Sequence, residues 1–417
     1  MNRTQIANRM KGQVKQFSGI LSKGLPKVVG RFVAEMVYGI VSQHSVHVAR
    51  IARSLNERIR LIKTLNRLCR QLGRKGLEEK LRENLIEEGS GHVDRDTLLI
   101  ADISDVSKKY AKKMEHLANI RDASEEKITK GYWTMKVIGA EVEKGKIIPL
   151  YEHLYSQDAP DFVSENEEIL KGVECLRKKT EGRGIWVMDR GGDRGELMIP
   201  LLDRQMRFII RLKGDRNVIY HGHAIIASQL ASSTKMLYVE RIVREESGGE
   251  KAQTIEFGFR RVRFPGRKER LFLVVVRGFG AQPLMLLTSL PVKPTRKSLF
   301  FVVEAYIRRW QIEETIRFEK QTYGIEDIRL RRYTRLQNMI AVTVAVAYFV
   351  AVWLGDGLRL PILTHHALAA AKRLFSIPDF RYYALADGIK WAFEGYQTPF
   401  WSHPQRSRAD PQIMLPI

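Results

Sequence analysis

Four side chains in the last third of the chain have types and a spacing that suit phosphate chemistry. Tyr306, Arg309, Glu313 and Lys320 lie at offsets of 0, 3, 7 and 14 residues in a segment with helical periodicity. At about 100° per residue they fall on one narrow stripe of a helix. A carboxylate flanked by two cations and a phenol could hold a metal ion against a phosphate. The alternative is a solvated helix face held by salt bridges.

Two aspartates each follow a short apolar run. Asp102 comes directly after residues 97–101 (TLLIA), and Asp189 comes directly after residues 184–188 (GIWVM). Both runs predict buried strands that end at the aspartate. Catalytic groups of α/β proteins gather at the carboxyl ends of strands, where a rigid sheet meets a crevice. The sequence therefore favours a site that contains both aspartates.

Together with Glu313, these aspartates make three candidate catalytic carboxylates on three separate elements. Three carboxylates in one pocket repel one another unless divalent cations neutralise them, and oxygen ligands favour Mg²⁺ or Mn²⁺. Two ions about 4 Å apart could activate an attacking water or hydroxyl and stabilise the leaving oxygen of a phosphodiester. Asp105 competes with Asp102 for this assignment, and Asp193 competes with Asp189.

The composition points to a polyanionic partner. The chain of 417 residues has a net charge of +23, which favours nucleic acid over an acidic membrane surface. Its two cysteines, Cys69 and Cys175, form no disulfide framework and suit a reducing cytoplasm. The basic, polar start predicts no signal peptide. The apolar run Met339–Leu354 is short for a bilayer, so we expect a buried helix and no membrane partner.

The order of periodic segments predicts an α/β fold, a mixed sheet with flanking helices interrupted by a β-rich insertion. Expected strands cover 97–101, 132–142, 147–154, 184–188 and 206–212 in the core and 236–243, 252–264, 270–276 and 284–290 in the insertion; expected helices cover 165–179 and 196–205. We divide the chain into a helical basic region (1–92), a first core part (93–213), the insertion (214–297), a second core part with the Glu313 helix (298–354) and a helical C-terminal segment with a tail (355–417).

The N-terminal region carries more than half of the net charge. Residues 1–80 contain 17 Lys and Arg against 4 Asp and Glu, an excess of 13. Arg50 and Arg53 project from one helical segment, and a basic face continues with Arg58, Arg60, Lys63, Arg67 and Arg70. This pattern predicts a helix pair that docks on DNA, and its alternative is a merely basic bundle surface.

The spacing Tyr306, Arg309, Glu313, Lys320 resembles the YREK signature of bacterial cut-and-paste insertion-sequence DDE transposases. Asp189 followed by Arg190 is similar to the second catalytic aspartate of that family, and Asp102 to the first. The gaps of 87 residues (102 to 189) and 124 residues (189 to 313) also suit the family, whose core carries a β-rich insertion. The resemblance covers roughly residues 95–350 and implies a ribonuclease-H-like core.

The resemblance also implies roles for individual residues. Asp102, Asp189 and Glu313 would be the metal ligands, for two Mg²⁺ or Mn²⁺ ions. Tyr306, Arg309 and Lys320 would grip phosphates of the transposon end, as would Arg211 and Lys213. Some relatives stack a flipped base on an insertion-domain Trp during a hairpin step, but residues 214–297 contain no Trp.

The expected activity is metal-dependent cleavage at terminal inverted repeats, followed by attack of the freed 3′-OH on target DNA. The expected partners are double-stranded DNA, as inverted repeats and as target, and a second copy of the chain in a synaptic dimer. The expected location is the bacterial cytoplasm, at the nucleoid. Two other functions fit the same residues: a metal-dependent nuclease on this core, and a non-catalytic DNA-binding protein derived from a transposase.

Overall fold

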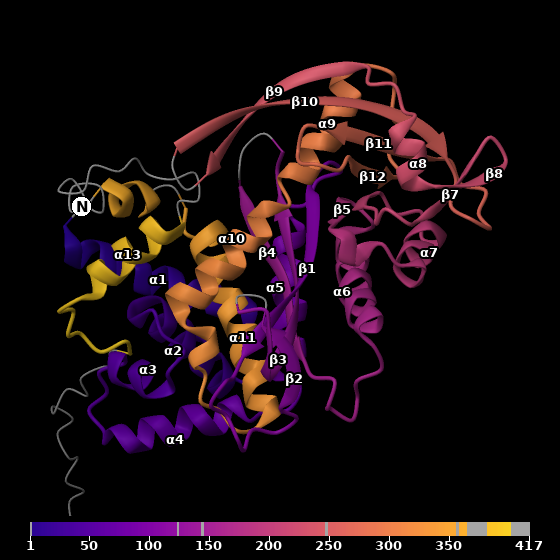
Figure 1. Ribbon diagram of the computed structural model, residues 1–417. Helices are drawn as coiled ribbons and strands as arrows, with labels where there is room; N and C mark the ends of the chain where they lie inside the picture. The colour runs from indigo at the N-terminus through magenta and orange to yellow at the C-terminus, as the bar shows by residue number, and fades with distance from the viewer. Residues whose placement is uncertain are drawn as a thin grey trace, which may run out of the picture.

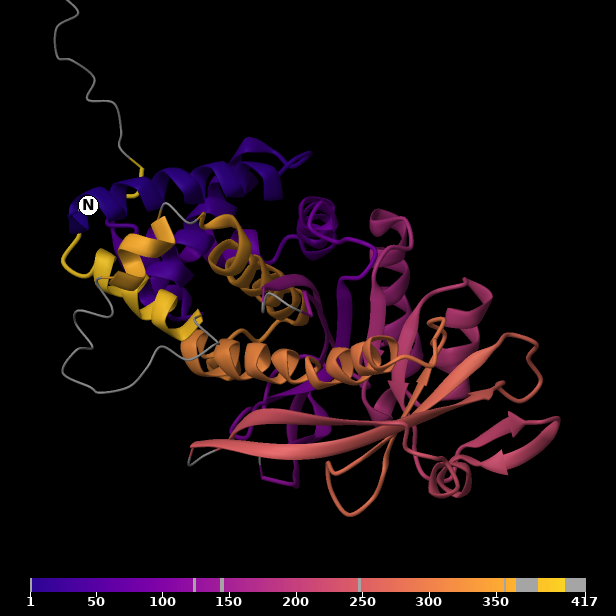
Figure 2. The same ribbon diagram turned by 90° about the horizontal axis from the view of Figure 1, so that it is seen from above.

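One large mixed sheet runs through the molecule, with helices on both of its faces (Figures 1 and 2). The computed structural model describes residues 2–122, 125–142, 146–246, 249–355, 358–364 and 382–401. Its strands are β1 (Leu98–Ser107), β2 (Ala118–Asp122), β3 (Lys127–Ala140), β4 (Ile147–Tyr155), β5 (Ile185–Met188), β6 (Phe208–Arg211), β7 (Asn217–Tyr220), β8 (His223–Ile226), β9 (Tyr238–Glu246), β10 (Gly249–Val262), β11 (Leu271–Arg277) and β12 (Leu284–Thr288). The predicted mixed α/β class is confirmed.

The described residues contain helices in the N-terminal region, between the strands and after the last strand. They are α1 (Arg3–Leu21), α2 (Lys27–Gln43), α3 (Val48–Ser54), α4 (Leu61–Leu72), α5 (Leu77–Ser90), α6 (Glu165–Thr180), α7 (Gly195–Asp203), α8 (Ala227–Ser232), α9 (Arg296–Ile307), α10 (Trp310–Phe318), α11 (Tyr333–Tyr348) and α13 (Tyr382–Phe393), with π-helical turns at Glu319–Tyr323 and Phe349–Trp353. Figure 1 shows α1 to α4 and α13 at one end and the hairpin of β7 and β8 at the other. The N-terminal region is therefore helical, as predicted.

The strand order places β1 and β5 at the centre of the sheet. Among the described residues, the sheet has ten strands: nine follow the order β2-β3-β1-β5-β6-β12-β11-β10-β9, and the tenth, β4, pairs with β3. β1 is antiparallel to β3, whereas β1, β5 and β6 run parallel to one another. Parallel strands end at the same edge, so the residues that follow β5 and β6 lie close together.

Alternating side chains on β1 pack into two different hydrophobic cores. Leu98 and Ile100 belong to the core that includes the buried residues of α9, whereas Leu99 and Ala101 belong to the core of α6, α7 and the N-terminal helices. Because side chains alternate between the two faces of a sheet, Asp102 lies on the same face as Ile100, toward α9 and α10. The sheet register therefore directs the first candidate carboxylate toward the helix that carries Glu313.

The prediction that Asp102 follows the end of its strand is wrong. Asp102 lies within β1, which pairs with β3 along its whole length, from Leu98 to Ser107. The pairing of β1 with β5, in contrast, ends at Ile100. At Asp102, β1 therefore has no neighbouring strand on its β5 side. The Asp102 side chain can border a crevice there, as a residue at the end of a strand would.

The insertion strands do not form a separate sheet. All four expected strands are present as β9 to β12, but β12 pairs with β6, so they continue the core sheet (Figure 1). Sequence reasoning missed β2, the hairpin of β7 and β8, and α8, all of which are short. Residues 143–145, between two of the expected strands, and most of the C-terminal tail lie outside the described residues. The domain boundaries stay a prediction.

The segment from Tyr306 to Lys320 is not one continuous helix. It breaks at Arg308 and Arg309 between α9 and α10, and Lys320 lies in the π-helical turn that follows α10. Figure 2 shows α9 and α10 end to end along one side of the sheet. Because the helix breaks, the four side chains cannot keep the single stripe that a regular 3.6-residue period gives.

The apolar helix near the C-terminus lies in the core. Tyr333–Trp353 is the helical segment among the described residues that is long and apolar enough to cross a membrane by length and composition. Within the protein, 83% of its apolar window is buried, by α1, α2, α5 and β4 among others. This burial favours the predicted core helix, which joins the N-terminal helices to the sheet.

A buried ionic triad ties the π-helical turn after α10 to the sheet. The Nζ atom of Lys136 on β3 lies 2.9 Å from Glu152 on β4 and also contacts Glu319, and all three side chains are buried. Burial raises the pKa of Glu319 to about 8, with Lys136 opposing and Glu152 adding to the rise. Lys136 is also the cross-strand partner of Asp102, so this triad lies beside the candidate site on the same face of the sheet.

We predict that Lys136→Met lowers the free energy of unfolding by about 3–5 kcal/mol, because it leaves two buried carboxylates without a counter-charge. Urea denaturation measures this change. The triple variant Lys136→Met, Glu152→Leu, Glu319→Leu is the matched control and should recover most of the loss, since it removes every buried charge. A single variant within 1 kcal/mol of wild type, on the scale of an exposed ion pair, would contradict this role.

Candidate active site

Asp102 and Asp189 come together at the centre of the sheet. Both line one pocket of about 170 Å³, together with Ile103, Met188 and residues from the start of α6. Asp102 belongs to β1, and Asp189 follows the last residue of β5, its parallel neighbour. The predicted pairing of two aspartates from adjacent strands is therefore present in the structure.

Close backbone packing fixes the Asp189 carboxylate. Its Oδ1 atom accepts a hydrogen bond of 2.6 Å from the Gly191 N–H and so caps the short 3-10 turn Arg190–Gly192. A Cβ atom on Gly191 would lie 2.9 Å from that oxygen, and one on Gly192 would lie 2.6 Å from the Met188 Cβ. Glycine is required at both positions by this close approach, and the turn holds the carboxylate at the pocket.

Glu313 joins the two aspartates through Arg309. The Arg309 guanidinium lies 2.6 Å from Glu313 Oε1 and 3.7 Å from Asp102 Oδ2, and its side chain is 11% exposed. Glu313 lies in the first turn of α10, where the helix dipole favours a negative charge. The helix break at Arg309 therefore places a cation between carboxylates from two different elements.

The electrostatics of the site favour an added positive charge. Burial raises the pKa of Asp102 to about 7, and repulsion from Asp189 and from Glu313 adds to the rise while Arg309 opposes it. Burial opposes the charge on Arg309, but Tyr306, Glu313 and Asp102 raise the pKa of that group overall. With every group ionised, three carboxylates and one guanidinium leave a formal charge of −2, which is the charge a divalent cation balances.

The oxygen donors of this cluster suit Mg²⁺ or Mn²⁺, but their present arrangement is not a finished metal site. Among the described residues, no three His, Cys, Asp or Glu side chains are arranged to hold a metal ion together. The reason lies in Arg309, which stands between Asp102 and Glu313. The carboxylates fit the predicted ions by chemistry and charge, and a shared ion requires the guanidinium to move aside.

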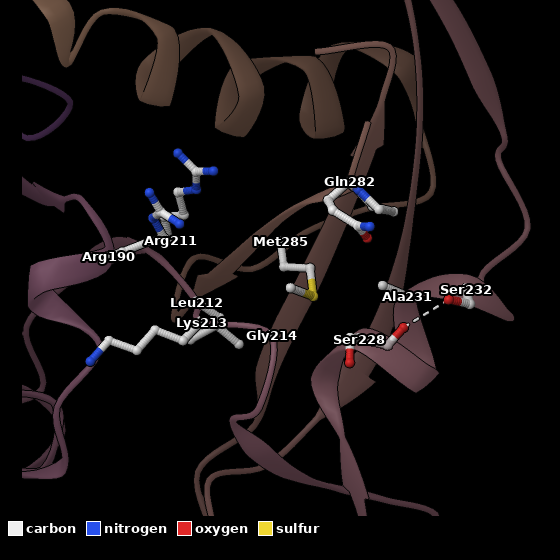
Figure 3. Close-up of a pocket in the computed structure, with 11 residues that line it drawn as sticks. Arg190, Arg211, Leu212, Lys213, Gly214, Ser228, Ala231, Ser232, Gln282 and Met285 are labelled. Atoms are coloured by element: carbon white, nitrogen blue, oxygen red, sulfur yellow. Dashed lines mark hydrogen bonds between the residues drawn. The ribbon is translucent and has the colours of Figure 1, made fainter. Parts of the chain in front are cut away.

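A second pocket is basic and includes Arg190, the residue that follows Asp189 in the sequence. It has a volume of about 330 Å³, and Arg190, Arg211 and Lys213 line it together with Gln282 and Met285. Figure 3 shows the side chains of Arg190 and Arg211 on the same side of this pocket, while Lys213 extends away from them. Within the described part of the chain, none of these three cations has an ion-pair partner. They are free to bind phosphate beside the aspartates.

The other residues of the predicted stripe have structural contacts. Tyr306 is 7% exposed, and its ring lies 5.8 Å from the Arg309 guanidinium carbon. Lys320 lies 3.2 Å from Asp105 and 3.0 Å from Glu326. Tyr306 therefore supports Arg309, and Lys320 joins β1 to the segment after the π-helical turn instead of facing Glu313.

The two competing aspartates have partners of their own. Asp105 is buried and bonded to Lys320. Asp193 is also buried, and it accepts hydrogen bonds of 2.6 Å from Arg216 and from the backbone N–H of Lys213. Neither aspartate lines the pocket that Asp102 and Asp189 share. The geometry therefore favours Asp102 and Asp189 over both.

Sequence reasoning did not single out Arg194 or Glu165, which line the same pocket as the two aspartates. They form an ion pair of 2.5 Å, and Arg194 also donates to Asn166 at 2.9 Å. Arg194 could have been indicated only by its closeness to Asp189 in the sequence. Glu165 lies on α6, more than twenty residues before Asp189, so its sequence position gave no such signal.

One of three comparisons with known proteins supports a function for the chain. Residues 172–350, less than half of the chain, match the family model described as a transposase DDE domain, which supports a DDE transposase. No curated protein matches the chain. Among solved structures, the chain is similar to a cryo-EM structure of a piggyBac transposase synaptic complex with hairpin DNA, with 9% identity and a TM-score of 0.43 over 92% of this chain and 72% of that one. A likeness at that level carries no argument about function.

We predict that Asp102→Asn stabilises the protein at pH 8 when EDTA removes divalent cations. The pKa of Asp102 is raised from 3.8 to about 7, so its protonation stabilises the fold fully below about pH 4, and this contribution is lost as the pH rises through about 7. Above that pH the neutral amide should add about 2–4 kcal/mol to the free energy of unfolding, and little at pH 4.

Urea denaturation at pH 4 and at pH 8 measures this difference. Asp96→Asn is the matched control, because the Asp96 side chain is 72% exposed and does not line the pocket. Equal stability of Asp102→Asn and wild type at pH 8 would show that the charge of Asp102 is not destabilising.

Proposed function

We propose that the protein is a DDE transposase that cleaves DNA at terminal inverted repeats and joins the freed 3′-OH ends to target DNA. The observation that carries the proposal is the meeting of Asp102 and Asp189 in one pocket, with Glu313 linked to Asp102 through Arg309. The match of residues 172–350 to a transposase DDE domain supports it. The mixed sheet, with β1, β5 and β6 parallel, suits a ribonuclease-H-like core.

Asp102, Asp189 and Glu313 are the residues that would hold two Mg²⁺ or Mn²⁺ ions. Bound there, such ions would polarise a phosphodiester and lower the pKa of an attacking water or hydroxyl. The protein itself keeps the carboxylates on β1, after β5 and in the first turn of α10, which are three rigid elements. Arg309 offsets one of the three negative charges in the free protein and would be positioned to bind a phosphate once it turns away.

Arg190, Arg211 and Lys213 would hold the DNA backbone beside this centre. Arginine can bind a phosphate through two parallel hydrogen bonds, which fixes the orientation of the backbone as well as attracting it. Hydrolysis would free a 3′-OH, and this hydroxyl would then displace a strand of target DNA by direct transesterification. Each step is an in-line displacement at phosphorus, so no covalent link between protein and DNA is needed.

The remaining parts of the proposal follow from the reaction and the charge. Two transposon ends must be cut and joined together, which requires a synaptic complex of two copies of the chain. The basic N-terminal region would bind the ends. The protein would act in the bacterial cytoplasm, on DNA of the nucleoid. A nuclease on the same core would cleave without strand transfer, and a DNA-binding protein without catalysis would do neither.

We predict that Asp102→Ala, Asp189→Ala and Glu313→Ala each lower the rate of Mg²⁺-dependent cleavage by at least about 100-fold, because each removes a group that organises charge in the transition state. The substrate is a labelled duplex that carries the inverted repeats flanking the coding sequence. Binding, measured by gel shift, should stay near the wild-type level, because the basic surfaces are unchanged.

Asp96→Ala, with an exposed carboxylate outside the site, is the control and should cleave normally. Strand transfer is followed on the same gels with pre-cleaved ends and a target plasmid. Normal cleavage by any of the three variants would remove that residue from the site. Cleavage by wild type without transfer would favour the nuclease.

A further inference from the structure

A set of unpaired cations surrounds α3 and α4. Arg50, Arg53, Arg58, Arg60, Lys63 and Arg70 are exposed, and within the described residues none of them has an ion-pair partner. Residues 45–72 contain a single acidic residue, Glu57, which is bonded to Arg31 and Arg67. This surface is therefore uniformly positive and complementary to a nucleic-acid backbone.

One face of α4 carries exposed side chains of the types that can read bases. Lys63, Asn66 and Arg70 are exposed, and at about 100° per residue they fall within an arc of about 60°. Ile62, which is 55% exposed, lies at the margin of that arc. Lys and Arg bind guanine in the major groove, Asn binds adenine with two hydrogen bonds, and an apolar side chain can contact a thymine methyl group. Figure 1 shows α4 along the lower margin of the molecule.

The opposite face of α4 is fixed to the protein. Thr64, Leu68 and Leu72 are buried, and Asn338 of α11 donates hydrogen bonds to the carbonyls of Leu72 (2.7 Å) and Arg74 (2.9 Å) at the end of the helix. At its start, Glu57 accepts a hydrogen bond of 2.6 Å from the Thr64 hydroxyl.

Arg67 belongs to this fixed face and not to the free basic face that its sequence position suggests. It bonds to Glu57 and Glu35, and Glu35 also accepts a hydrogen bond of 3.0 Å from Trp401. A helix held at both ends and along one side presents its outer side chains in a fixed register, which base recognition requires.

We propose that α4 is a recognition helix that lies in the major groove of duplex DNA and selects its sequence through Lys63, Asn66 and Arg70. This inference rests on the proposed function, since it names the residues by which the transposase would choose its ends. The exposed arginines of α3 and of the loop before α4, Arg53, Arg58 and Arg60, would bind the flanking phosphates. Such contacts orient the helix without reading sequence.

The test is a selection from a library of 20-base-pair random duplexes with the full-length protein. We expect wild type to enrich one sequence. Asn66→Ala should lose the preference for an adenine at one position, and Arg70→Ala and Lys63→Ala should each lose the preference for a guanine. Each variant should bind the wild-type sequence about 5- to 150-fold more weakly at fixed salt, with a smaller loss on random duplex. Lys178→Ala, an exposed cation on α6, is the charge-matched control and should select the wild-type sequence.

Two outcomes would overturn the inference: no enrichment by wild type, or the same enriched sequence for wild type and all three variants. Both can be told apart from failure of the proposed function. Metal-dependent cleavage without sequence selection would contradict the recognition helix and support the proposed enzymatic activity. If sequence selection depends on α4 but the protein neither cleaves nor joins DNA, the recognition helix would be supported and the proposed enzymatic activity contradicted.

Discussion

The bridge that Arg309 makes between Asp102 and Glu313 is the interaction on which the site depends. It joins a strand in the centre of the sheet to a helix that begins more than two hundred residues later in the sequence. Without a counter-charge, Asp102, Asp189 and Glu313 would repel one another in a half-buried pocket. The break between α9 and α10 makes this bridge possible, because it places Arg309 at the start of α10 within reach of β1.

Beside this bridge, buried carboxylates are also paired with cations from other elements. Lys136 lies opposite Asp102 on the neighbouring strand and holds Glu319, which directly precedes Lys320. Lys320 in turn is bonded to Asp105, three residues after Asp102. Two ion pairs thus fix the end of α10 to β1 and β3. These contacts therefore hold the end of the helix that carries Glu313 against the strand that carries Asp102.

Much of the sheet and of the candidate site could be predicted from the sequence, because both depend on strong local patterns. The apolar runs before Asp102 and Asp189 indicated two buried strands, and the sheet brings both aspartates to one pocket. Local patterns could not indicate that β1 continues past Asp102, since that depends on pairing with β3, or that the helix breaks at Arg309. The partners of Lys320 and Asp193 also come from distant segments, so spacing alone gave Lys320 a place beside Glu313 that it does not have.

We propose that Asp102, Asp189 and Glu313 act together as one divalent-cation site. The most direct measurement is Mn²⁺ binding by electron paramagnetic resonance, with full-length protein and a bound duplex. We expect saturable binding by wild type and a loss of at least about 10-fold in affinity for Asp102→Asn, Asp189→Asn and Glu313→Gln, with Asp96→Asn unchanged. Equal Mn²⁺ binding by wild type and the three site variants would contradict it.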